Sequence, residues 1–151
     1  GDTTLRRIEP GASAYGGRFS PDGKWIVYTG TLSGGIEQVY VRSFPGLSNR
    51  AQVSLTGGGT PVWSADGKRI YYTNGEQLLA ATIGSTEPFT ITSRTVVLAR
   101  GYTFSAVHAD YDVAKDGRTI LALQSPSQSA QLVVVRNFGA ELKARVRGTP
   151  R

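Results

Sequence analysis

Residues 19–29, with the sequence FSPDGKWIVYT, decide the fold, because the same pattern occurs twice more along the chain. Residues 63–73 read WSADGKRIYYT, and residues 113–123 read VAKDGRTILAL. In each segment an apolar residue lies three positions before an Asp-Gly pair, a Lys or Arg follows the glycine, and an apolar run comes next. The successive aspartates are 44 and 50 residues apart. The chain therefore contains an internal structural repeat of about that length.

Each Asp-Gly pair predicts a tight turn between two antiparallel strands. Asp can accept a hydrogen bond from the backbone two residues further on, and Gly adopts a positive φ at no steric cost. The β-branched and aromatic residues on either side favour strands. We therefore interpret Asp22, Asp66 and Asp116 as turn residues rather than as catalytic acids.

Further strands are expected after each hairpin, and loops rich in small residues separate the units. The third strands are expected at 38–41, 78–83 and 131–135, and fourth strands at 52–55 and 95–98 in the first two units only. The loops are expected at 10–17, 57–60 and 101–109. Four short strands in about 45 residues, repeated, are typical of β-propeller blades. We therefore predict an all-β chain of about three blades, each made of antiparallel strands.

The repeat also divides the chain. Residues 1–9 are expected to hold an orphan strand, Thr3–Ile8, which completes a neighbouring blade, and residues 10–56, 57–100 and 101–136 to form blades 1, 2 and 3. Residues 137–151 are expected to form a short C-terminal helix and a basic tail. Asn137 can cap that helix, and Phe138, Leu142 and Val146 fall on one of its faces.

The repeat units resemble those of TolB-like β-propellers, a WD-repeat-like family. The resemblance is carried by residues 19–24 (FSPDGK) and by residues 58–68 (GGTPVWSADGK). The end of the chain, residues 111–118 (YDVAKDGR), 133–138 (VVVRNF) and 141–143 (ELK), is similar to the C-terminal end of propellers fused behind bacterial Ser/Thr protein kinases. The chain departs from these patterns at Ala65, at Ala114-Lys115 and at Phe138, where the families usually have Pro, Pro and Trp. The resemblance implies half of a six-bladed ring, in a sensor or scaffold module of a larger bacterial signalling protein.

Composition excludes several kinds of chemistry. The 151 residues, 39% of them apolar, can bury a core, and no apolar run is long enough for a membrane-spanning helix. The absence of cysteine excludes disulfides, thiolate catalysis, and zinc or iron–sulfur sites that need thiolate ligands. The net charge is +6, but residues 143–151 carry four basic residues and no acid, so the rest of the chain is nearly balanced. We interpret this stretch as a solvated tail, with attraction to phosphates or anionic lipid as the alternative.

No catalytic or cofactor motif stands out. Kinase motifs and a Gly-x-Ser-x-Gly nucleophile elbow are absent from the sequence, and Gly57-Gly58-Gly59 precedes a strand, whereas a phosphate loop would open a helix. The single histidine, His108, lies near Asp110 and Asp112; a metal site there is the weaker alternative to a loop histidine or a partner contact. The aromatic residues repeat in phase with the units, which favours packing between blades over stacking on nucleic-acid bases. We therefore expect no enzyme activity, no cofactor, no bound metal and no nucleic-acid partner.

These observations predict a protein- or peptide-binding propeller module, with a non-catalytic propeller fragment of a serine peptidase or hydrolase as the alternative. Binding is expected on the loops that enter the first strand of each blade, because loops on a rigid scaffold commonly carry recognition. The candidate residues are Tyr15, Arg18, Thr60, Tyr102, His108 and Asp110. The compartment is left open, with the extracytoplasmic (periplasmic or cell-surface) side of a bacterial membrane preferred.

Ring closure gives one further expectation. Three blades are fewer than the roughly 4–8 that close a propeller, and an open half-ring exposes apolar faces and strand edges. We predict a homodimer that completes a six-bladed ring, with Thr3–Ile8 of one copy paired to Gln131–Val135 of the other. The alternative is that the missing blades belong to a longer parent chain, because this one begins at Gly1 rather than at methionine.

Overall fold

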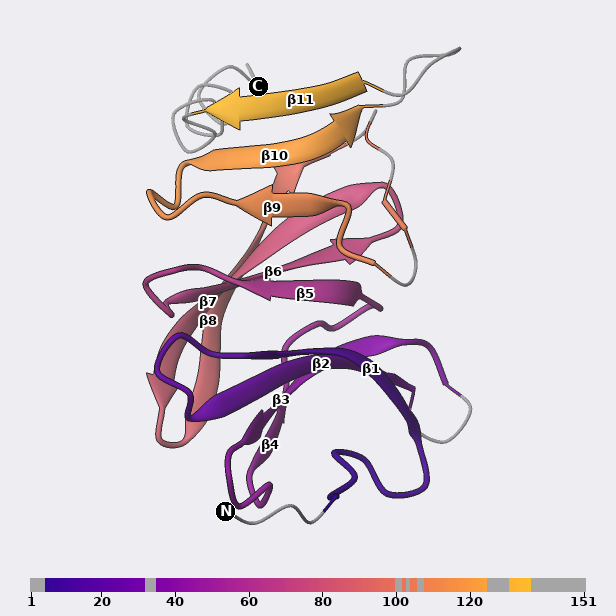
Figure 1. Cartoon of the computed structure of the whole chain (residues 1–151), viewed down its shortest axis with the longest axis vertical. Helices are drawn as coiled ribbons and strands as arrows, with labels where there is room; N and C mark the ends of the chain where they lie inside the picture. Colours follow the sequence, from indigo (N-terminus) through magenta and orange to yellow (C-terminus); the bar gives the residue numbers. More distant parts are fainter. Residues whose placement is uncertain are drawn as a thin grey trace, which may run out of the picture.

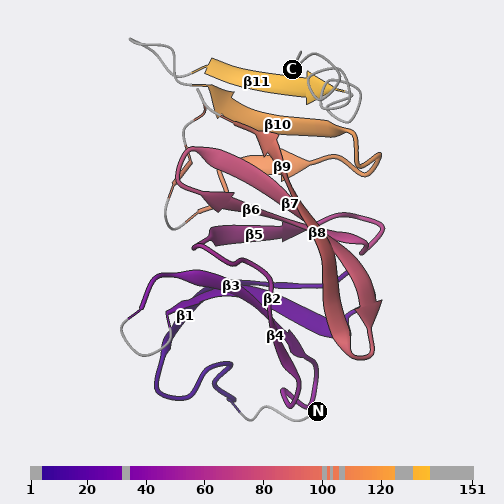
Figure 2. The same ribbon diagram turned by 180° about the vertical axis from the view of Figure 1, so that it is seen from behind.

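Every secondary-structure element in the described part of the chain is a β-strand. The computed structural model describes residues 5–31, 35–99, 102, 104–105, 108–124 and 131–136. The strands form three antiparallel sheets that follow one another along the long axis of the molecule (Figures 1 and 2). Blade 1 has the order β1 (Ser13–Phe19), β2 (Trp25–Thr31), β3 (Gln38–Ser43) and β4 (Arg50–Gln52). Blade 2 has β5 (Gly59–Trp63), β6 (Arg69–Asn74), β7 (Gln77–Thr86) and β8 (Phe89–Leu98), and blade 3 has β9 (Tyr111–Val113), β10 (Thr119–Gln124) and β11 (Gln131–Arg136).

This architecture confirms the predicted all-β fold built of antiparallel blades. Blades 1 and 2 have four strands each, and the described part of blade 3 has three. The predicted terminal helix, residues 137–151, lies outside the described residues, as do residues 1–4. The rest of the expected orphan strand, residues 5–8, lies in no strand of this structure. Ile8 packs instead against the cluster of Ile26, Tyr28 and Tyr40, on the face of blade 1 that points away from blade 2.

The Asp-Gly turns form as the repeat predicts. The carboxylate of Asp22, Asp66 or Asp116 accepts the backbone N–H two residues further on, at 3.1, 3.0 and 2.8 Å respectively. The glycine after each aspartate has a φ of 70, 68 and 61°, where a side chain would be strained. All three aspartates are thus turn residues.

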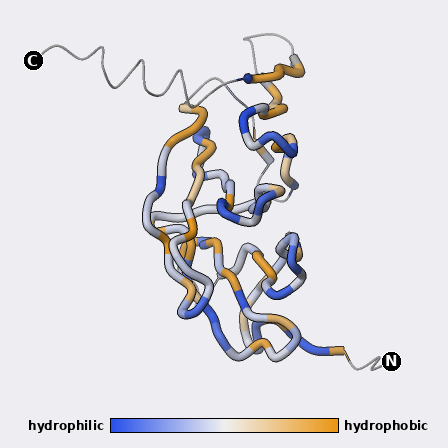
Figure 3. The backbone as a smooth tube through the Cα atoms, turned by 90° about the vertical axis from the view of Figure 1, so that its left-hand side faces the viewer, coloured by the Kyte–Doolittle hydropathy of each residue, from blue (hydrophilic) through white to orange (hydrophobic). Residues whose placement is uncertain are grey.

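Two apolar cores hold the blades together. Successive side chains of a strand point to opposite faces of its sheet, so every second side chain of a blade points toward the adjacent blade. Between blades 1 and 2 the core consists of Trp25, Val27, Val39, Val41, Val53, Ile70, Tyr72 and Ala81. Between blades 2 and 3 it consists of Val62, Tyr71, Leu78, Ala80, Leu98, Tyr111, Val113, Ile120 and Ala122. Figure 3 shows hydrophobic stretches recurring along the stacked sheets. Trp25, Trp63, Tyr71 and Tyr72 pack in or against the cores between blades, as expected of the repeat-phased aromatics, whereas Tyr28 packs with Ile26 and Tyr40 on the face of blade 1 that points away from blade 2.

Several expected element boundaries are wrong. The fourth strand of blade 1 ends at Gln52 rather than spanning 52–55, and the Val39 N–H donates to the Ser54 side-chain hydroxyl at 2.8 Å instead of to a backbone carbonyl of a longer strand. The fourth strand of blade 2 begins at Phe89 rather than at residue 95, and residues 13–17 and 59–60, expected as loops, belong to β1 and β5. The first part of β8, residues 89–94, was not expected as a strand because it carries several polar residues. Such residues are tolerated here because β8 lies at the exposed edge of its sheet. Within the described residues, no helix is long and apolar enough to cross a membrane.

Candidate functional site

A groove of about 310 Å³ lies between β1, β5 and the segment that leads into β9. This volume falls at the lower end of the range for ligand pockets, roughly 300–1,000 Å³. Each blade contributes to the walls, which are lined by Gly16, Gly17, Arg18, Thr60, Pro61, His108 and Ala109. The groove is therefore a property of the assembled blades and not of any one repeat.

Two β-bulges shape the groove. The pairing of β1 with β2 shifts register between Tyr15 and Arg18, and that of β5 with β6 shifts between Gly59 and Val62. These positions are equivalent in the repeat, because Tyr15 and Gly59 each lie seven residues before the aspartate of their turn. Bulges re-aim the backbone and are frequent next to binding sites. Here the residues inside the bulges, 16–17 and 60–61, are those that line the groove.

Thr60 joins all three blades at the base of the groove. Its N–H donates to the hydroxyl of Thr29 in blade 1 at 3.1 Å, and its carbonyl accepts the hydroxyl of Tyr111 in blade 3 at 2.7 Å. Its own hydroxyl lies 2.9 Å from that of Thr73 in β6. The φ of Thr60 is 49°, a rare conformation for a β-branched residue, and such strain persists only where surrounding contacts impose it.

Arg18 and His108 provide the polar groups that face the groove. Both side chains are exposed, and neither the guanidinium nor the imidazole makes a hydrogen bond to another residue of the described segments. The backbone around each is nevertheless held in place. The Trp63 indole N–H donates to the Arg18 carbonyl at 3.2 Å, and the His108 N–H donates to the Ser105 hydroxyl at 3.2 Å. Two N–H-bearing side chains from blades 1 and 3 thus converge on the groove with open hydrogen-bonding capacity.

The structure brings together three of the six candidate binding residues. Arg18, Thr60 and His108 line the groove, although Arg18 and Thr60 lie in strands and Thr60 is buried rather than on a loop surface. Thr60 therefore shapes the groove through its backbone.

The other three candidates lie elsewhere. Tyr15 is half-buried, and burial together with its hydrogen bond to Glu37 raises the pKa of Tyr15 to about 12. Tyr102 stacks on Phe104, with ring centroids 6.4 Å apart, and packs against the core between blades 2 and 3. Asp110 accepts the Ser105 N–H at 3.1 Å and so fixes the loop that carries His108.

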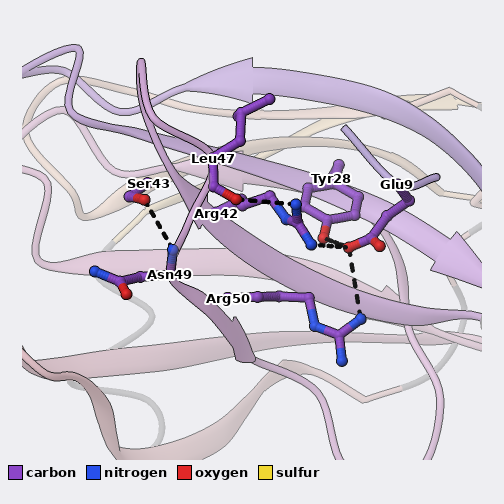
Figure 4. A network of polar contacts seen from close by, with 7 residues as sticks. All are labelled: Glu9, Tyr28, Arg42, Ser43, Leu47, Asn49 and Arg50. Atoms are coloured by element: carbon purple, nitrogen blue, oxygen red, sulfur yellow. Dashed lines mark hydrogen bonds and ion pairs between the residues drawn. The ribbon is translucent and has the colours of Figure 1, made fainter. Parts of the chain in front are cut away.

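Sequence reasoning missed one polar cluster. Glu9 is buried on blade 1 and contacts Tyr28, Arg42 and Arg50, which lie between 19 and 41 positions away in the chain (Figure 4). No spacing rule could have joined these residues, because the contacts depend on how the chain before β1 folds back over the blade. Within the described residues, no three His, Cys, Asp or Glu side chains are grouped as a metal site would need.

A second hollow, of about 860 Å³, separates the β7–β8 turn from blade 1. None of the candidate binding residues lines it. The turn reaches blade 1 through Phe89, whose ring lies 4.8 Å from that of Trp25.

Comparison with known proteins identifies the fold of the chain. No model of a protein family matches the chain, and no curated protein matches it. Three solved structures share its arrangement: an oligogalacturonate lyase in complex with manganese (16% identity, TM-score 0.64), TolB from Acinetobacter baumannii (20%, 0.58) and a putative TolB from Agrobacterium tumefaciens (15%, 0.59). The fold is that of a TolB-like β-propeller.

These likenesses extend over 89%, 82% and 86% of this chain, and they show the fold alone. The chain spans only 39%, 30% and 47% of the three structures, in the same order. It corresponds to a part of such a propeller.

Proposed function

We propose that this chain is a non-catalytic recognition module that binds a segment of another protein in the groove between the three blades. The observation that carries the proposal is the convergence of Arg18 and His108, from different blades, on a groove whose base is fixed by Thr60. Guanidinium and imidazole groups donate hydrogen bonds to peptide carbonyls and carboxylates. A rigid base with open donors above it suits recognition, because little ordering is needed on binding.

The experiment uses peptides selected for binding to the immobilised full chain from a random displayed library. Arg18→Gln and His108→Ala should each weaken the selected peptides by tenfold or more, whereas Lys68→Ala, an exposed control in the turn of blade 2, should leave affinity within twofold. Selected peptides that bind both groove variants as tightly as the original chain would place recognition elsewhere.

The resemblance at residues 133–138 and 141–143 supports placing the module in a bacterial protein that also carries a Ser/Thr kinase domain. An extracytoplasmic location is part of the same proposal and rests on the same resemblance. No feature of the groove favours the peptidase-fragment alternative.

The homodimer belongs to the proposal as well. Two observations support it: β11 lies at the edge of its sheet, and the far face of blade 3 exposes Leu132 and Val134, which are 65% and 52% accessible. Light scattering should give a mass twice 16.1 kDa, and deletion of residues 1–8 should return the chain to a monomer. A monomer before deletion would refute the dimer, and a dimer of unchanged affinity after deletion would refute the predicted strand pairing.

A further inference from the structure

The hairpin of β7 and β8 extends beyond the blade to which it belongs. Its two strands have ten residues each, whereas β3 and β4, the corresponding strands of blade 1, have six and three. The far end of the hairpin lies beside blade 1 (Figures 1 and 2). Thr86, Glu87 and Pro88 at this end are exposed, so they contribute little to an apolar core.

The pairing of this hairpin is irregular near its middle. The register of β7 with β8 shifts twice between Thr82 and Ser85, and a side chain at Gly84 would collide with β8. Bulges of this kind re-aim a strand and are frequent next to binding sites. Beyond them, the Phe89 ring lies 4.8 Å from the Trp25 ring, which holds the end of the hairpin against blade 1.

The hollow of about 860 Å³ lies between this end of the hairpin and blade 1. Its volume is within the usual range for ligand pockets, roughly 300–1,000 Å³. Residues within 22–25 and 43–51 of blade 1 and residues 86–89 of blade 2 line it. Further blades of a closed ring would pack against the outer faces of blades 1 and 3, so they would leave this hollow uncovered.

Two phenylalanine rings form apolar parts of the walls. Phe44 is 43% exposed and Phe89 is half-buried, so both present ring surface to the hollow. The Phe44 ring packs edge-on against that of Phe19, with the ring centroids 4.9 Å apart. Flat apolar surfaces of this kind suit the C–H faces of a sugar ring or the ring of a proline.

The charged groups that remain available in the hollow are balanced. Of the four charged residues that line it, Asp22 accepts hydrogen bonds within its own turn, and the Arg50 guanidinium lies 3.6 Å from the Glu9 carboxylate. One base, Lys24, and one acid, Glu87, remain for a ligand. An uncharged ligand therefore fits this site better than an ion does.

The available polar groups include both donors and acceptors. The side chains of Lys24, Asn49, Thr86 and Glu87 make no hydrogen bond to another residue of the described segments. The ammonium group only donates, the carboxylate only accepts, and the amide and the hydroxyl do both. A sugar hydroxyl also donates and accepts, so it can pair with each of them. A proline-rich segment offers carbonyl acceptors alone and would leave the Glu87 carboxylate without a partner.

We propose that the hollow between the β7–β8 hairpin and blade 1 binds an uncharged oligosaccharide. Its sugar rings lie against Phe44 and Phe89, and its hydroxyl groups pair with the polar side chains of the two blades. No residue lines both this hollow and the groove of the proposed function, so the two sites are separate.

The test applies the fluorescently labelled full chain to an array of immobilised neutral oligosaccharides of glucose, galactose, mannose and N-acetylglucosamine. Decaproline and an oligoglucuronate on the same array represent the other occupants. At least one neutral oligosaccharide should bind, and decaproline and the oligoglucuronate should not. Titration calorimetry with the neutral oligosaccharide that binds best then compares variants of the chain.

Phe44→Ala and Glu87→Ala should each weaken that oligosaccharide at least fivefold. The matched controls Leu55→Ala and Glu76→Ala, which change exposed residues outside the hollow, should leave its affinity within twofold. If Phe44→Ala does not fold, Phe44→Leu takes its place with the same expected loss, because leucine keeps an apolar contact with Phe19 but lacks the flat ring.

Failure of every neutral oligosaccharide to bind would overturn the proposal, and so would binding of decaproline or of the oligoglucuronate alone. Affinity that is unchanged in Phe44→Ala or in Glu87→Ala would overturn it as well, because the oligosaccharide would then bind elsewhere on the chain.

Discussion

Tyr111→Phe isolates the contact that ties blade 3 to the base of the groove. The substitution keeps the aromatic ring in the core between blades 2 and 3 and removes only the hydroxyl that donates to the Thr60 carbonyl at 2.7 Å. Tyr111 is 5% and Thr60 4% exposed, so the carbonyl loses its partner where water has little access. Leaving a buried acceptor unsatisfied costs about 1–3 kcal/mol.

The expected loss of unfolding free energy is therefore about 1–3 kcal/mol. For a chain of this size each kcal/mol corresponds to roughly 3 °C in melting temperature. Urea unfolding followed by the fluorescence of Trp25 and Trp63 measures the loss directly, since both indoles lie at blade interfaces. Tyr102→Phe is the matched control: its hydroxyl makes no hydrogen bond to a described residue, so its effect should stay below about 0.5 kcal/mol. Equal stability of Tyr111→Phe and the original chain would refute the argument that this bond holds Thr60 in its strained conformation.

Two further substitutions or conditions test the packing and the turns. Gly58→Ala should destabilise the fold by about 1–3 kcal/mol, because its Cβ would lie 2.8 Å from the buried Tyr72 ring; Gly46→Ala, with its nearest neighbour at 3.8 Å, is the control for urea unfolding. Hydrogen bonds from Ser20 and from Ser64 lower the pKa of Asp22 and of Asp66, and backbone N–H groups lower that of Asp116. Since folding lowers these pKa values, the stabilisation is complete above the unfolded value of about 3.9 and is lost as pH falls through the folded values. The melting temperature should thus hold between pH 5 and 7 and fall below about pH 4, less steeply in Asp66→Asn; an unchanged profile in that variant would contradict this account.

The hairpins could be predicted from the sequence because their determinants are local. An aspartate and a glycine in adjacent positions, followed by an apolar run, specify the turn, and all three turns form with the expected hydrogen bond. The extent of β7 and β8 could not be predicted, since these strands exceed the repeat and pair through three register shifts. Gly84 lies at one such shift, where a Cβ would meet the Thr92 side chain at 2.5 Å.

The candidate site was predicted only in part, because its residues can be located along the chain from local sequence but their packing cannot. The expectation that binding lies on the loops entering each first strand selected Arg18, Thr60 and His108, and the packing of the three blades places them around one groove. Sequence reasoning could not tell that Tyr102 packs against the core or that the Thr60 side chain points toward β6, because both depend on packing between blades. The Glu9 cluster had no local signal at all.

Some positions of the repeat are the same in all three blades, and others differ from blade to blade. The aspartate and glycine of the turn recur in all three units, and the residue six positions before that aspartate does not: it is Gly16, Thr60 and Asp110 in turn. In blade 1 this residue takes a positive φ within a bulge, in blade 2 it takes a strained positive φ and joins the three blades, and in blade 3 its carboxylate fixes the loop of His108. The position six residues before the turn aspartate thus has a different structural role in each blade, in each case next to the groove. This position is not needed to form the turn, so its residue can vary among otherwise similar repeats. Because it lies where the blades meet, such variation can change what a propeller recognises.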